Sequence, residues 1–189
     1  LPALRHTPVL LADLALATYA KYRNVTSAKK VLDVPGVTRT AAGKTLLRLV
    51  NFNDFTPFDK RIARHRLRTH SEHLLQKTLK KRLDLIVEAE EWGQKAVRAG
   101  DWSFQLLTLN TLERENRRLY AQLSQLSAPR GLNKTQRATY KKILQKQAQP
   151  YLVKANQIAK KIKEFWGNRK ALDSLKKDYE KAPAAMAHL

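Results

Sequence analysis

The stretch LLQKTLKKRLDLIVEA, residues 74–89, decides the fold class, because its apolar residues recur every three or four positions. That spacing is typical of an amphipathic α-helix, which places such residues on one face. Helical spacing extends from Pro57 towards Val97, which is longer than an ordinary globular helix. We therefore predict a break near residues 69–71, with Ser71 capping the second of two helices.

Three shorter helices are predicted before this stretch. The first covers about residues 7–22, with Pro8 at its first helical position, where the missing N–H of proline does no harm. A short helix follows Thr26, and a third helix covers about residues 40–50. Residues 51–56 carry two Asn and precede a Pro, so they are predicted to form a connector.

Further helices are predicted after it. Residues 100–101, Gly-Asp, suit the end of one helix and the N-cap of the next. A loop is expected at 127–132. Pro150 interrupts the following helical pattern, so it is expected to kink that helix or to start a new one. A last helix is predicted around residues 172–179, with a frayed tail over 182–189.

Composition supports an all-α fold built from antiparallel helix pairs. The chain has 189 residues with only six Gly and seven Pro, and no segment of useful length alternates apolar and polar residues. The absence of Cys excludes a disulfide framework, a thiolate zinc site and a Cys nucleophile. Uneven helix lengths favour a helical-repeat superhelix over a symmetric four-helix bundle. We predict one helical domain over 1–189, with divergent N-terminal helices over 1–56 and more regular ones over 57–181.

The chain is strongly basic. It carries 37 Lys+Arg against 16 Asp+Glu, a formal net charge of +21. In successive blocks of fifty residues the balance is positive each time, which favours a generally cationic surface that attracts any polyanion. No membrane span is expected, because the most apolar stretch, 8–20, is too short and contains Asp13.

Several segments between about Leu74 and Trp166 resemble a known family in their order along the chain. The segments are LKKRL at 79–83, AGDW at 99–102, PRGL at 129–132, and Tyr140 followed by QAQPYLVKA at 147–155. Together they resemble the C-terminal part of tetratricopeptide-repeat proteins from the envelopes of predatory and gliding Gram-negative bacteria. Residues 1–56 lie outside this resemblance.

The resemblance implies a helical scaffold in the periplasm or envelope that binds a protein partner and performs no chemistry. It implies neither a cofactor nor a metal. Since the chain is so basic, an acidic partner is expected. A cytoplasmic location is the alternative.

The alternative function is nucleic-acid binding through residues 26–50. A short helix, the turn at 34–38 and a second helix carrying Arg39, Lys44 and Arg48 have the outline of a helix-turn-helix. In that module the second helix enters the major groove and basic residues contact phosphates.

Three motifs that suggest chemistry are better explained structurally. AAGKT at 41–45 lacks the first glycine and the preceding strand of a phosphate-binding loop. His65, His70 and His73 lie among arginines that repel a cation. The acidic cluster at 88–91 has Lys81, Lys95 and Arg98 within helical reach, which favours ordinary ion pairs over paired catalytic carboxylates.

The candidate binding residues are Arg61, Arg64 and Arg68. They belong to the densest basic group of the chain, and steps of 100° along a helix would place them on one side with Arg66 turned away. Three guanidinium groups on one face suit carboxylates or phosphates, which they can bind bidentately.

Overall fold

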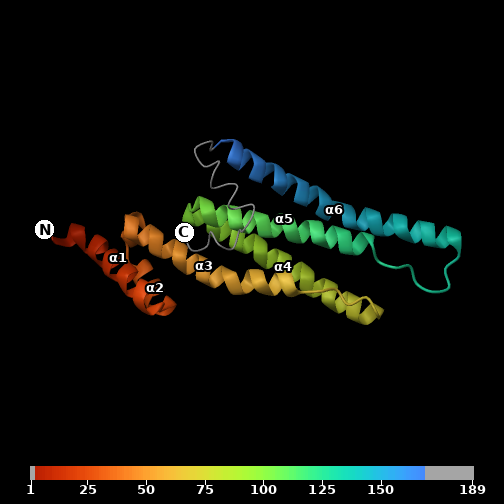
Figure 1. The fold of residues 1–189 in the computed structure, drawn as a ribbon, viewed down its shortest axis with the longest axis horizontal. Helices are drawn as coiled ribbons and strands as arrows, with labels where there is room; N and C mark the ends of the chain where they lie inside the picture. The colour runs from red at the N-terminus through yellow and green to blue at the C-terminus, as the bar shows by residue number, and fades with distance from the viewer. Residues whose placement is uncertain (1–2, 169–189) are drawn as a thin grey trace. The chain divides into compact units, whose positions relative to one another are not determined.

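The computed structural model describes residues 3–168, and this part of the chain is α-helical without any strand (Figure 1). The predicted all-α class is therefore confirmed. The helix predicted around 172–179 and the tail over 182–189 lie outside the described residues. Contacts divide the chain into two compact units, with the boundary between Phe58 and Asp59.

The first unit contains α1 (Ala3–Tyr22), α2 (Val25–Leu32), a 3-10 turn (Val37–Arg39) and the first part of α3 (Ala41–Arg64). One cluster of its core gathers residues from all three helices, Tyr19, Ala28, Leu46 and Val50. The predicted position of Pro8 is wrong, because α1 begins at Ala3 and includes Pro8. The Pro8 ring packs over the turn at Gly36, where an added Cβ would lie 3.3 Å from Pro8 Cγ.

Helix α3 continues through the predicted connector at 51–56 and through Pro57. Phe52, Phe55 and Phe58 are buried along it at three-residue steps. This apolar stripe outweighs the local preference of Asn and Pro to interrupt a helix. The hydroxyl of Thr56 donates to the carbonyl of Phe52 at 2.7 Å, as helical Thr residues often do.

The second unit contains the end of α3, then α4 (Glu72–Ala99), α5 (Trp102–Ser124) and α6 (Lys134–Gly167). Both α4 and α6 pack against α5, which lies between them (Figure 1). The predicted break is confirmed, since α3 ends at Arg64 and the Ser71 hydroxyl accepts the N–H of Leu74 at 3.3 Å. Gly100 ends α4 with φ 66°. The Asp101 carboxylate caps α5.

Pro150 does not start a new helix, because α6 runs unbroken from Lys134 to Gly167. Buried Leu144, Ala148 and Ala155 hold both sides of Pro150 against the rest of the unit. A capping box formed by Asn133 and Gln136 fixes the start of α6, where each side chain accepts from the other residue's backbone N–H.

The glycine of the AAGKT motif at 41–45 has a structural role, because Gly43 packs closely against the turn that precedes α3. Its N–H donates to Thr40 Oγ1 at 2.9 Å, and an added Cβ would lie 1.9 Å from the carbonyl oxygen of Val37. Only a glycine permits this approach between the start of α3 and the preceding turn.

We expect Gly43→Ala to destabilise the protein by roughly 1–3 kcal/mol, because the new methyl group must displace the turn. Chemical denaturation monitored by circular dichroism measures the effect. The matched control is Gly93→Ala in α4, where the nearest neighbours of the new Cβ lie at 3.6 Å or more. That control should be neutral or stabilising by up to about 1 kcal/mol. Equal stability of the two variants would show that the Val37 contact is not tight.

Candidate functional site

The three predicted arginines do not share a helical face. Helix α3 ends at Arg64, so Arg68 lies in the connector, where its backbone N–H donates to Thr78 Oγ1 at 3.0 Å. Arg61 forms an ion pair with Glu88 of α4. Arg64 and Arg68 are exposed. The geometric basis of this site is therefore wrong, because the helix needed to align Arg68 has already ended, and its role in binding stays a prediction.

The end of α3 is held instead by two arginines from other helices. Arg82 of α4 donates to the carbonyls of Ile62 at 3.1 Å and His65 at 2.7 Å. Arg118 of α5 donates to the carbonyls of Ala63 at 2.7 Å and His65 at 2.8 Å. The last carbonyls of a helix lack partners within it and carry its negative end, so cations are favourable there.

Glu115 of α5 balances these charges. Its carboxylate forms an ion pair with Arg82, and both side chains are 0% exposed. Arg114 Nε lies 2.9 Å from the other Glu115 oxygen, Oε1. An amino group of Arg118 lies 3.5 Å from Oε2, the oxygen that Arg82 contacts. Burial lowers the pKa of Arg82, and the charge of Glu115 opposes that change. The guanidinium stays protonated, as arginines do in proteins.

Asp59 extends the network back to α3. It accepts hydrogen bonds from Thr111 and Arg114 of α5, each at 2.8 Å. Both carboxylates of the network are thus engaged by guanidinium groups, and Glu115 is closed to solvent. Such an arrangement joins α3, α4 and α5 but offers no acid or base to a substrate.

His65 lies beside this network. Burial, followed by the charge of Arg82, lowers the pKa of its imidazole below the ordinary value. Its Nδ1 atom is buried and has no hydrogen-bond partner among the described residues. Protonation would add a charge next to two guanidinium groups, so the ring is neutral at pH 7.

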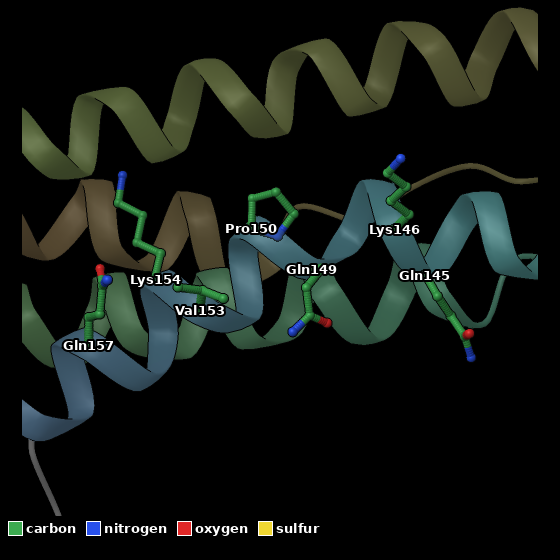
Figure 2. Close-up of a pocket in the computed structure, with 7 residues that line it drawn as sticks. All are labelled: Gln145, Lys146, Gln149, Pro150, Val153, Lys154 and Gln157. Carbon is green, nitrogen blue, oxygen red and sulfur yellow. The ribbon is translucent and has the colours of Figure 1, made fainter.

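Two open hollows lie beside helices α4, α5 and α6. One hollow of about 490 Å³ is lined by residues of α4 and α5, among them Glu90, Val97 and Leu109. A second hollow of about 660 Å³ runs along α6 and includes Val153 and Lys154 (Figure 2). An ion pair between Lys154 and Glu90 joins the two hollows. We call the two hollows together the α4–α6 groove.

The groove combines apolar and cationic side chains. Figure 2 shows Lys146, Pro150 and Lys154 on the side of α6 turned toward α4. Val153 is 45% exposed and lines one hollow, and Val97 is 67% exposed and lines the other. Concave surfaces that combine apolar side chains with a few polar groups are typical of binding sites.

The acidic cluster at 88–91 forms ion pairs, but with other partners than predicted. Glu88 pairs with Arg61 of α3 and Glu90 with Lys154 of α6. Lys95 lies over the Trp92 ring, 4.2 Å from its centre. Tertiary contacts thus replace the expected pairs within α4.

The remaining candidates acquire no added support from the structure. Helix α2 and helix α3 are joined by residues 33–40, a longer link than the three- or four-residue turn of a DNA-binding helix-turn-helix. Within residues 3–168 no three His, Cys, Asp or Glu side chains are grouped to hold a metal ion. In the same part of the chain no helix is long and apolar enough to cross a membrane.

Sequence reasoning missed both Arg82 and the groove. A signal for Arg82 was present, since it stands on the apolar face of residues 74–89, three and four positions before Leu85 and Ile86. The groove had no comparable signal, because Glu90 and Lys154 lie far apart in the chain.

No protein-family model, curated protein or solved structure matches this chain.

We expect Arg82→Met to destabilise the protein by roughly 3–5 kcal/mol, because it leaves Glu115 buried with fewer partners and uncaps α3. Urea unfolding gives the free energy. The control, Arg117→Met, breaks an exposed pair with Glu113 in α5 and should cost under about 1 kcal/mol. Similar losses in the two variants would contradict a structural role for the buried pair.

We expect the stability of the protein to fall as the pH drops below about 6.5, the ordinary pKa of His. Below that pH the unfolded chain takes up a proton at His65 that the folded chain resists, so protonation favours unfolding. His65→Gln should flatten the dependence of the unfolding free energy on pH between about 5 and 7. An unchanged slope in His65→Gln would show that this ring titrates normally.

Proposed function

We propose that residues 59–168 act as a non-enzymatic helical scaffold that binds an acidic segment of a partner protein in the α4–α6 groove. The observation that carries this proposal is the pair of hollows that meet at the Lys154–Glu90 ion pair. The arrangement of α4 and α6 around α5 is also compatible with a tetratricopeptide-like superhelix, in which stacked helix pairs present an open face to a ligand.

The composition of the groove favours a peptide over a small molecule. Both hollows are open to solvent, and the Lys154–Glu90 ion pair links the lining of one to the lining of the other. Exposed Val97 and Val153 would contact apolar side chains of a ligand. An amphipathic helix supplies such side chains at every third or fourth position.

Charge complementarity selects an acidic partner. The groove is lined by the cations Arg98, Lys146 and Lys154. One acid, Glu90, also lines it and forms an ion pair with Lys154. Residues 116–163, which include most of α6, contain twelve Lys or Arg and no Asp or Glu. A positive face of this kind raises the association rate of an acidic partner and opposes a basic one.

A designed peptide tests the proposal. We would label a sixteen-residue helical peptide, on the order of four turns, with Leu at heptad spacing and Glu at the remaining positions, and titrate it by fluorescence anisotropy. Val153→Asp should weaken binding by at least about tenfold, because it puts a like charge and a polar group in the groove. Ile143→Asp is the matched control, since Ile143 is 49% exposed on the same helix and lines neither hollow.

Three outcomes would contradict the proposal. The first is no preference for the amphipathic peptide over a scrambled peptide of the same composition. The second is an equal effect of the two Asp variants. The third is a DNA duplex that binds more tightly than the peptide, with an affinity that falls steeply with salt and with substitution of Arg39 and Lys44 by Gln. That third result would favour the helix-turn-helix prediction for residues 26–50.

A further inference from the structure

We infer that a basic hollow at the connection between α5 and α6 binds a compact anion with several phosphate groups. The hollow measures about 1120 Å³ and is formed by the end of α5, the loop that follows it and the first two turns of α6. Its basic lining residues are Arg130, Lys134, Arg137 and Lys141. This site is separate from the α4–α6 groove and does not depend on the proposed function of the groove.

The local fold fixes these cations around one space. The Asn133–Gln136 capping box sets the first residue of α6, so Lys134, Arg137 and Lys141 follow at steps of three and four residues on one face. The loop opposite them turns at Gly131, whose φ of 91° is readily adopted by glycine. Figure 1 shows this loop swinging away from the ends of α5 and α6 before it returns to start α6.

Arg137 is also oriented by the loop. Its Nε donates to the carbonyl of Leu132 at 2.8 Å, which joins the side chain to the opposite wall. Its terminal amino groups have no acceptor among the described residues, and the same holds for the charged groups of Arg130, Lys134 and Lys141. A guanidinium held in this way has lost part of its rotational freedom before a ligand arrives, which lowers the cost of binding.

No carboxylate lines the hollow. The nearest acids in the sequence are Glu115 and Glu164, and Glu115 is buried in the Arg82 network. Four like charges around a concave surface add their fields and concentrate anions there. The site therefore demands a ligand with more than one negative charge.

The lining residues also define the class of anion. Two guanidinium groups favour phosphate oxygens, which they can contact with two parallel hydrogen bonds. The lining includes no Phe, Tyr or Trp. Proteins that hold single-stranded nucleic acid combine a basic channel with aromatic rings on which the bases stack. The hollow has basic side chains but no aromatic ring on which a base could stack. Its chemistry therefore favours a ligand whose phosphate groups lie close together and which carries no base.

Inorganic tripolyphosphate is the probe, titrated into the full chain by isothermal calorimetry at low and at physiological salt. The triple variant Lys134→Gln, Arg137→Gln, Lys141→Gln should weaken its binding by at least about tenfold, since each charge-assisted hydrogen bond is strong. It leaves Asn133 and Gln136, and hence the capping box, intact. The control triple is Lys160→Gln, Lys161→Gln, Lys163→Gln, which removes the same charge from exposed positions of the same helix and should change binding by less than about twofold.

Circular dichroism melts establish that both triples fold. Equal weakening by the two triples would overturn the proposal, because charge would then act only as a diffuse field. Failure of the wild-type chain to bind tripolyphosphate would also overturn it. Tighter binding of an oligonucleotide than of tripolyphosphate, lost in the first triple, would assign the hollow to nucleic acid and contradict the absence of base contacts.

Phosphate groups of this kind occur on soluble polyphosphates and on lipid headgroups, and a second arm separates these sources. The chain is mixed with phosphatidylglycerol vesicles, with and without tripolyphosphate. Vesicle binding that tripolyphosphate displaces, and that the first triple loses, would support a membrane source. Binding of tripolyphosphate without binding to vesicles would support a soluble one. Vesicle binding that tripolyphosphate does not displace would contradict a shared phosphate site.

Discussion

The buried ion pair between Arg82 and Glu115 is the constraint on which the second unit depends. Two charges removed from water are costly unless every polar atom around them finds a partner. Here the compensation comes from the end of α3, whose carbonyls accept from Arg82 and Arg118. One guanidinium thus joins three helices, because it is carried by α4, paired with α5 and bonded to α3. Helices α4 and α5 cannot slide along one another without separating the buried pair of Arg82 and Glu115.

The position of the groove follows from this constraint. The network uses the face of α5 that carries Thr111, Glu115 and Arg118, and this face is thereby committed to α3 and α4. Helix α6 packs on another part of α5. Helices α4 and α6 then share a neighbour while their own facing surfaces are joined by the Lys154–Glu90 pair. In the hollow beside α4, residues of α5 such as Leu109 and Leu112 form part of the lining.

The sequence predicts those features that depend on a few neighbouring residues. The all-α class, the break at 69–71, the cap at Ser71 and the junction at 100–101 were all predicted because capping and periodicity act over one or two turns. Pro57 was expected to open a helix after a connector at 51–56, but the buried residues Phe52, Phe55 and Phe58 keep α3 continuous across both. Pro150 was expected to kink its helix or to start a new one, and the second alternative is wrong because buried residues on both sides keep α6 continuous. The energy that decides those positions comes from packing against other helices, which a local pattern does not contain.

The arginines show the same limit for the candidate sites. Arg61, Arg64 and Arg68 were grouped because they are dense in the sequence, but α3 ends inside the group. Arg82 was quoted only within the segment LKKRL, although its place on the apolar stripe indicated the burial that the structure shows. The groove and the hollow depend on which helices meet, and residues that line them come from segments up to tens of positions apart.

The net charge counted over blocks of fifty residues also concealed a local excess of cations. Blocks of fifty residues each give a similar positive balance, but residues 116–163 hold twelve cations and no acid. Electrostatic interactions in physiological salt extend over about 8 Å, so the balance within such a radius decides what a surface attracts. Lys141 of the hollow and Lys146 of the groove are five residues apart on α6, about 7.5 Å along the axis but about 140° apart around it. Their side-chain charges are therefore farther apart than the axial rise alone, and salt screens them from one another. A local balance thus divides the basic part of α6 into two separate surfaces, each with its own set of cations.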